Sequence, residues 1–336
     1  LWLPSEKGLV MEAFIQPGFW IFVLALAGIY GIFSLGLQIQ YGVGGIMNFG
    51  HVGMMAVSGY TIAVLVIKYE WSFWWAALAG VILAAFLGAL LGLTTLRLSG
   101  DYFAIASIAF AEIVRYWILN TDNVTGGTQG TLAIPSPNGF SSYTDKPDVI
   151  LTWISDRLYP LIGDEASRDL SMVLVVWPFF LLFIWISSRL QKTSWARVLR
   201  ATREDDDVPR SLGKNVFRFR LQTLIIGSVF GGIAGVFWAL QFALLAPEDF
   251  LRIVTFYGWM ILILAGSTRV KGLFVAAIFF GFLYGATRFL EFWPLSLLSS
   301  PERAYLRVFL IGFVIVLLMV KRPQGLFGKR QEMVLE

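Results

Sequence analysis

Long hydrophobic segments without charge, separated by short polar stretches, recur along the whole chain. A helix of roughly 20 apolar residues crosses a bilayer core, whereas a membrane barrel would show short alternating segments. The pattern therefore predicts an all-α polytopic membrane protein with about nine transmembrane helices, within a range of roughly eight to ten. The expected spans are Gly18–Leu37, Gly42–Ile67, Phe73–Leu96, Tyr102–Leu119, Leu170–Ile186, Leu221–Leu244, Ile253–Ala265, Gly272–Leu290 and Arg307–Val320.

The distribution of Lys and Arg predicts the orientation of these helices. Short loops rich in Lys and Arg stay in the cytoplasm. With an odd number of spans, the basic segments fall on one side: Arg97, residues 189–220, Arg269 with Lys271, and the tail from Lys321. We therefore expect a cytoplasmic C-terminus and an outside N-terminus. Residues 1–336 would form one transmembrane domain, with 120–169 as a periplasmic loop and 189–220 as a cytoplasmic coupling loop.

Composition agrees with a membrane protein and argues against other classes. Of the 336 residues, 57% are hydrophobic and 14% are charged, which is too little charge to cover a soluble surface. Cysteine is absent and His51 is the single histidine. We therefore expect no metal site, no catalytic residues and no enzyme activity. The net charge of +4 comes from basic residues whose positions fit a membrane topology, so we expect no nucleic-acid partner.

Small residues recur every four positions in two of the predicted spans. Such spacing places them on one helix face and lets neighbouring backbones approach closely. We expect these helices to be tightly packed rather than to bind a substrate. The residues are Gly80, Ala84, Gly88 and Gly92 in the third span, and Gly227, Gly231 and Gly235 in the sixth.

The second predicted span is interrupted by glycines and carries polar residues. Gln40 precedes it, and Asn48 and His51 lie within it. Broken helices are tolerated inside a membrane where they line a cavity. One interpretation is that Gln40, Asn48 and His51 line a translocation path. The alternative is a close-packed helix whose polar groups bond to neighbouring helices.

The fourth predicted span carries an acid and a base on one helical face. Glu112 and Arg115 are spaced i, i+3. An isolated charge inside a bilayer is costly, so the two are expected to neutralise each other or to face a polar interior. A structural pair is favoured over a contact with substrate, and the translocation path is the alternative.

The stretch Ser194–Asn215 has the pattern of a protein-docking segment. Apolar residues recur at helical spacing after Ser194, and Glu204–Asp207, Pro209 and Gly213 follow them. Proline and acidic residues are favoured in a first helical turn, so we predict two short helices, the second beginning near Asp207. Charges of both signs suit docking to a protein. Because the chain contains no Walker A sequence, an ATPase would have to be another chain.

Four stretches, in this order and spacing, resemble motifs of the permease subunits of the branched-chain amino-acid ABC transporter family, which also serves neutral amino acids and urea. A fifth, RPQGLF from Arg322, is also similar. The four are QYGVGGIMNFGHVGMMAVSGY from Gln40, LRLSGDYFAIASIAFAEIVR from Leu96, TGGTQG from Thr125 and SWARVLRATREDDDVPRSLGKNVFRFRLQ from Ser194.

The resemblance implies a coupling helix that docks on a cytoplasmic ATPase. The matching residues are Arg203, Glu204, Asp205, Leu212 and Gly213, whereas Val208 and Pro209 replace the alanines usual in the family. The implied partners are two ATPase subunits that carry ATP–Mg, a second homologous permease, with a heterodimer preferred, and a periplasmic substrate-binding protein. This chain itself would hold no cofactor.

The function implied is ATP-driven import of branched-chain or other neutral amino acids by alternating access, across a bacterial inner membrane. A urea importer of the same family is an alternative. A stand-alone channel or secondary transporter is another, although it would need no docking segment, and a proton-coupled one needs several intramembrane acids. A membrane enzyme would need a cluster of acids, bases or ligands, and a structural subunit would not need a broken span.

Overall fold

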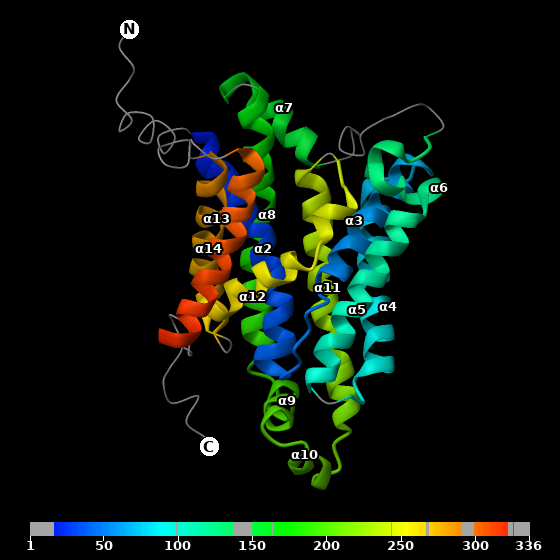
Figure 1. Ribbon diagram of the computed structural model, residues 1–336, viewed down its shortest axis with the longest axis vertical. Coiled ribbons are helices and arrows are strands. Elements are labelled where there is room, and N and C mark those ends of the chain that lie inside the picture. Colours follow the sequence, from blue (N-terminus) through cyan, green and yellow to red (C-terminus); the bar gives the residue numbers. More distant parts are fainter. Residues whose placement is uncertain are drawn as a thin grey trace.

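The computed structural model describes residues 17–98, 100–136, 150–162, 164–242, 244–266, 269–289, 299–321 and 325. Every regular element in these ranges is helical, which confirms the predicted all-α class (Figure 1). Residues 1–16, the middle of the expected periplasmic loop at 137–149, and nearly all of the motif that starts at Arg322 lie outside the described ranges.

The elements follow one another along the chain as a series of long helices joined by short ones. They are α2 (Pro17–Leu37), the π-helix η1 (Gln38–Val43), α3 (Val52–Ile67), α4 (Phe73–Thr95), α5 (Gly100–Asn120), α6 (Asp122–Thr125), the 3-10 helix η2 (Gly127–Ala133), α7 (Ile150–Ile162), α8 (Asp164–Leu190), α9 (Ser194–Glu204), α10 (Asp207–Ser211), α11 (Val216–Gln241), the 3-10 helix η3 (Pro247–Phe250), α12 (Ile253–Ala265), α13 (Val270–Phe289) and α14 (Ser300–Lys321).

Five described helices are long and apolar enough to cross a membrane, namely Pro17–Val43, Phe73–Thr95, Gly100–Asn120, Asp169–Leu190 and Val216–Gln241. Four shorter apolar helices are Val52–Ile67, Ile253–Ala265, Val270–Ala286 and Tyr305–Leu317. These segments coincide with the predicted spans, so the chain is a multi-pass membrane protein. The number of crossings and the placement of the termini stay predictions.

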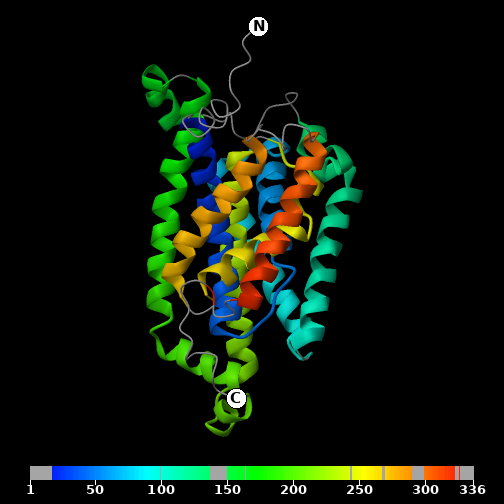
Figure 2. The ribbon, with the colours of Figure 1, turned by 60° about the vertical axis from the view of Figure 1, so that its left-hand side comes forward.

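The two ends of the helix bundle carry different short helices. α6 and α7 lie at the end where α2 begins, and α9 and α10 project from the opposite end (Figures 1 and 2). α7 lies within the expected periplasmic loop, and α10 begins at the predicted Asp207. The expected periplasmic and cytoplasmic segments therefore lie at opposite ends of the bundle.

α2 and α11 form the centre of the bundle. α2 is buried almost throughout and packs on α8, α11, α12 and α13, and α11 packs on α3 and α4. The small residues have the predicted packing role, because a Cβ atom at Gly80 would lie 2.9 Å from Ser58 Oγ. On α11, Gly227 faces Gln40 and Gly231 faces His51. The glycine stripe of α11 thus makes room for polar side chains of the interrupted segment.

The second predicted span is an α-helix only from Val52 onward. α2 continues as the π-helix to Val43, and residues 44–51 are non-helical before α3 begins. Gly45 has a φ of +67°, a conformation that strains any residue with a side chain. The helix boundary predicted at Gly42 is therefore wrong, because glycines place a break in the first third of that span. We call residues Gln40–His51 the broken segment.

The close packing of the broken segment against α5 gives a stability prediction. A Cβ atom at Gly50 would overlap the carbonyl oxygen of Ser107, so Gly50→Ala forces α5 away from the broken segment. We expect a loss of about 1–3 kcal/mol, measured as a lower melting temperature of the purified protein in detergent. Gly312→Ala is the matched control, because its Cβ atom would have no neighbour within 4 Å. Equal melting temperatures for the two variants would contradict this packing.

Candidate functional site

Several backbone N–H groups of the broken segment, and that of Val52 directly after it, find partners inside the protein. The Gly45 N–H donates to the Tyr41 carbonyl (2.9 Å) and the Ile46 N–H to the Gln40 carbonyl (2.9 Å). After the π-helix ends, side chains of other helices accept hydrogen bonds from the backbone. The Phe49 N–H donates to Ser107 Oγ of α5 (3.0 Å), and the Val52 N–H to Thr255 Oγ1 of α12 (3.1 Å). Inside a membrane such internal partners are required for non-helical backbone.

Gln40 and Asn48 are fully buried and hold this break together. Asn48 Nδ2 donates to Gln40 Oε1 (3.1 Å), and Gln40 Nε2 donates to the Leu224 carbonyl of α11 (3.2 Å). Asn48 Oδ1 accepts the Gly50 N–H (2.9 Å), and its carbonyl accepts from Trp259 Nε1 (3.2 Å). The Gln40 side chain thus bonds to a neighbouring helix, as the packing interpretation expected, whereas the Asn48 side chain bonds within the broken segment.

His51 is also fully buried, but its bonding differs from that of Gln40 and Asn48. Its ring lies between Gly36 of α2 and Gly231 of α11, with the Phe33 ring centroid 4.6 Å away. Within the described residues, neither ring nitrogen makes a hydrogen bond of good geometry, although the Phe33 backbone is close. A buried polar group without a partner is costly and calls for an explanation.

Glu112 and Arg115 form the predicted ion pair on α5. Arg115 Nε lies 2.9 Å from Glu112 Oε2, and Arg115 also stacks over the Tyr116 ring at 4.6 Å. The sequence analysis missed Arg252, whose Nε lies 3.8 Å from Glu112 Oε1. Its position directly before a short apolar segment was the signal that could have identified it.

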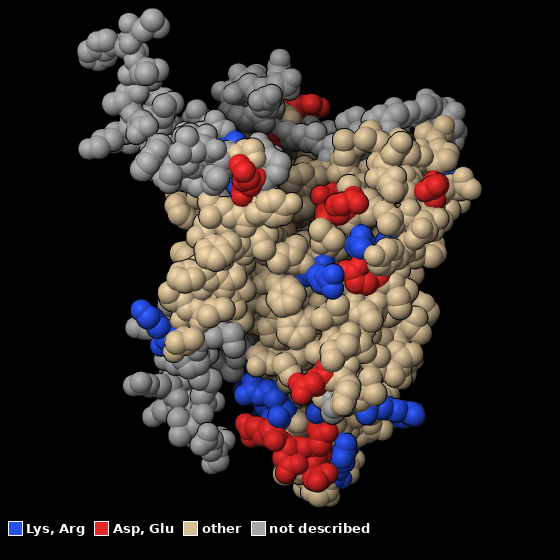
Figure 3. Space-filling view, in the orientation of Figure 1, with Lys and Arg blue, Asp and Glu red and all other residues tan. Residues whose placement is uncertain are grey.

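These three charged residues are more exposed than the buried trio. The side chains of Glu112 and Arg115 are 20% and 14% exposed, and that of Arg252 is 64% exposed. Figure 3 shows charged residues part way along this face of the bundle, separated by uncharged surface from the charged end that carries α9 and α10. The structure thus divides the predicted path residues into an internal group and a surface group.

The residues predicted to contact an ATPase point in two directions. Arg203, at the end of α9, turns toward the membrane bundle, and its Nη1 donates to the Gly42 carbonyl of the π-helix (2.9 Å). Glu204 and Leu212 are exposed where α9 and α10 project from the bundle, a region we call the tip, and Leu212 is 73% exposed. Asp205 Oδ1 accepts the Asp207 N–H (2.9 Å), and Gly213 ends the α10 turn with a φ of +72°.

Helix α10 is joined to the bundle by an ion pair of Asp206. Asp206 Oδ1 lies 2.9 Å from Arg220 Nη2 of α11, and Asp206 Oδ2 lies 3.3 Å from Arg210 Nη2 of α10. Pro209 is buried in the first turn, where a helix needs no donor from its nitrogen. Asp206 and Arg220 also line a polar pocket of about 260 Å³ together with Gly45–Met47 of the broken segment. The tip and the broken segment therefore share one pocket.

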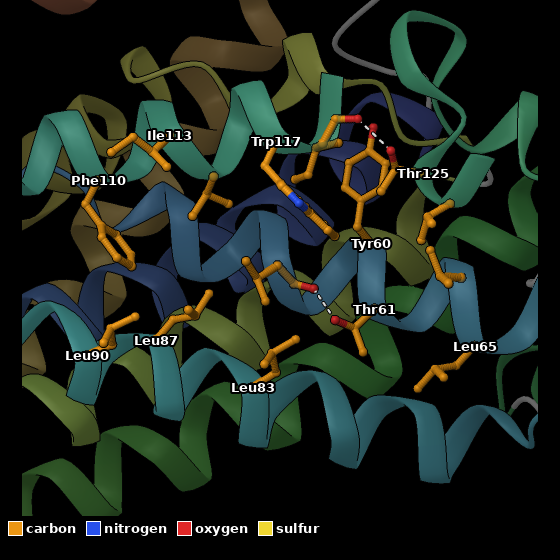
Figure 4. A pocket seen from close by; sticks show the side chains of 15 residues that line it. Tyr60, Thr61, Leu65, Leu83, Leu87, Leu90, Phe110, Ile113, Trp117 and Thr125 are labelled. Carbon is orange, nitrogen blue, oxygen red and sulfur yellow. Dashed lines mark hydrogen bonds between the residues drawn. The ribbon is translucent and has the colours of Figure 1, made fainter. Parts of the chain in front are cut away.

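A larger groove of about 460 Å³ lies between α3, α4 and α5 (Figure 4). Its lining is apolar and includes no charged residue. The polar groups in it already have partners, since Tyr60 Oη donates to the Leu245 carbonyl (3.2 Å) and Thr61 Oγ1 to the Val57 carbonyl (2.7 Å). A zwitterion would lose its hydration there without gaining partners, so this groove is not the polar site. Among the described residues, no group of three or more His, Asp or Glu could hold a metal.

The chain is similar to known transport proteins over most of its length. The sequence profile of the branched-chain amino acid transport system permease component matches residues 19–319. The high-affinity branched-chain amino acid transport system permease protein LivM of Escherichia coli (strain K12) is 32% identical over 305 residues, which are 90% of this chain and 69% of LivM.

A probable branched-chain amino acid transport permease protein LivM of Methanocaldococcus jannaschii is 25% identical, with 92% of this chain and 93% of the relative covered. The solved structure of PsaBC from Streptococcus pneumoniae in complex with Fab has 15% identity and a TM-score of 0.46, covering 95% and 97% of the two chains, a likeness too low to carry an argument. On the profile match and the Escherichia coli relative, this chain belongs to the family of branched-chain amino acid transport permease components.

Proposed function

We propose that this chain is the permease subunit of an ATP-driven importer that translocates branched-chain amino acids by alternating access. The names of the relatives support the substrate. The observation that carries the mechanism is the hydrogen bond from Arg203 to the Gly42 carbonyl. It joins the segment proposed to dock on an ATPase directly to the break in a membrane helix. A stand-alone channel would need no docking segment.

The two ends of the bundle support the orientation and the partners that we propose for the chain. The end with α9 and α10 carries many basic residues, which favours the cytoplasm. There the exposed tip formed by Glu204 and Leu212 would meet one of two ATPase subunits, which bind ATP–Mg. The opposite end would receive the amino acid from a periplasmic binding protein. A second homologous permease would complete the pore in a bacterial inner membrane.

Coupling requires two global states that the ATPases and the substrate bind with different affinity. In the proposed mechanism, closure of the ATPases moves α10, and α9 transmits the motion through Arg203 to the π-helix. Gln40, Asn48 and His51 then exchange partners as the broken segment moves. The missing hydrogen bond of His51 supports this, because a group without a partner in one state can gain one in another.

Reversing the charge of Glu204 tests the docking role. Glu204 is exposed at the end of α9, so Glu204→Lys is expected to leave the fold intact and to weaken ATPase binding. Uptake in proteoliposomes should fall about tenfold or more, as for loss of a charged contact in an interface. Lys321→Glu, an exposed charge reversal at the end of α14, is the control. Normal ATPase binding and uptake in Glu204→Lys would refute the assignment.

Removing the Arg203 side chain tests transmission separately from docking. Arg203→Ala should retain bound ATPase subunits and ATP hydrolysis but import several-fold less amino acid per ATP, because the Gly42 carbonyl loses its link to α9. Arg197→Ala, also exposed on α9, should behave as wild type. If the ratio of import to hydrolysis were the same in both variants, the link would have no role in coupling.

Substituting His51 separates transport from packing. His51→Leu removes two nitrogen atoms that lack good hydrogen bonds, so we expect no loss of melting temperature. Uptake should nevertheless fall several-fold, because the partner that His51 gains in the other state is lost, and His51→Asn should retain part of the activity. Unchanged uptake in His51→Leu would leave His51 with a packing role alone.

A further inference from the structure

Glu112 lies well inside the length of α5 that can cross a bilayer. α5 spans Gly100–Asn120, 21 residues, and is therefore about 31 Å long, close to the thickness of the hydrocarbon core. Glu112 precedes the last residue of α5 by eight positions, or about 12 Å of helix. Trp74 and Trp75 are exposed at the start of the neighbouring α4, and tryptophans are typical of the membrane interface. The charged residues at Glu112 thus lie within the membrane-spanning part of the chain.

Arg252 carries a charge at this depth that is not fully neutralised. Glu112 is the single described carboxylate within 4.0 Å of Arg252, and it is already closer to Arg115. The cluster of Glu112, Arg115 and Arg252 therefore has two positive charges and one negative charge. With 64% of its side chain exposed, Arg252 would be very costly against lipid. It must face water or a polar partner, and an anion would satisfy this requirement.

The start of α12 strengthens the positive potential at this position. α12 is a short helix of 13 residues that begins directly after Arg252, about halfway between the ends of the bundle (Figure 1). The N-terminal end of a helix is positive, and half-helices that begin within a membrane commonly point this end at an anionic group of a substrate. The guanidinium and the helix end thus favour the same kind of ligand.

An aromatic surface adjoins the charged cluster. Phe256 lies one turn after Arg252 on the same face of α12. Its ring centroid lies 5.5 Å from that of Phe49 in the broken segment, and Phe49 stacks on Trp259 at 5.0 Å. Phe49 and Phe256 are partly exposed. A ligand held by Arg252 can therefore lay an apolar group on these two rings.

We infer that Arg252, Glu112, Phe49 and Phe256 form a subsite for a free α-amino acid with an apolar side chain. Arg252 binds the carboxylate, Glu112 Oε1 binds the ammonium, and the two rings receive the side chain. Arg115 acts as a positioning residue that holds Glu112 through Oε2. The two charges of an amino acid are one carbon apart, which suits the close approach of Arg252 to Glu112. The inference rests on the proposed function and names the contacts within it.

The subsite makes a prediction about ligands that lack one charge. The full complex, purified without its binding protein, is incubated with radiolabelled leucine, and competitors are added. Isovalerate lacks the ammonium, isoamylamine lacks the carboxylate, and urea lacks both charges and the side chain. We expect wild type to bind leucine at least about tenfold more tightly than any competitor, since each charge-assisted contact is lost separately.

Variants of Arg252 then assign the carboxylate contact. Arg252→Gln should weaken leucine binding about tenfold or more without weakening the binding of isoamylamine. Arg252→Lys should recover part of the leucine affinity, and Lys271→Gln, beyond the other end of α12, should match wild type. Co-purification of the second permease is measured for each variant.

The possible results separate this inference from the proposed function. If wild type imports leucine with ATP but Arg252→Gln binds it as tightly as wild type, the subsite is wrong and the proposed function stands. If Arg252→Gln loses the second permease, Arg252 is an ion pair between the two permeases, which also overturns the subsite. If wild type neither imports nor binds leucine, both the subsite and the proposed function fail.

Discussion

A helix can be interrupted inside a membrane only if the peptide groups that it frees find partners within the protein. The arrangement of this bundle follows from that requirement. Ser107 of α5, Trp259 of α12 and the Leu224 carbonyl of α11 bond to the broken segment, and Thr255 of α12 bonds to Val52 directly after it. Three helices are thereby fixed around one short non-helical stretch. The same contacts place α12 beside the break and its first residues on the face of α5 that carries Glu112.

Glycine lets the break fit into the centre of the bundle. Gly36 and Gly231 leave space for the His51 ring, and Gly227 leaves space for the amide of Gln40. Larger residues at these positions would push α2 and α11 apart and leave the buried amides without partners. The same small residues therefore allow close helix packing and make room for the polar side chains of the break.

Much of the fold could be predicted because hydrophobic runs and basic loops are local signals. The bounds of the α12 segment and the start of α10 at Asp207 agree with the sequence analysis. The bonding of Gln40 could not be predicted, since its partner Leu224 lies 184 residues away. Arg203 was predicted to couple to an ATPase, and its bond to the Gly42 carbonyl could not be predicted, because only the fold places α9 next to the π-helix. Arg252 was missed for the same reason, as its significance depends on Glu112 of another helix.

Ion pairs contribute to the contact between α10 and the bundle. Asp206 is paired with Arg220 and Arg210, and these side chains are 26%, 29% and 58% exposed. Ion pairs with such exposure are screened by dissolved salt and contribute little at high ionic strength. The angle between α10 and the membrane helices is therefore set partly by the solution around it. A concentrated salt wash would weaken these ion pairs while leaving the apolar bundle intact. The ionic strength of the solution would therefore change how rigidly α10 is held.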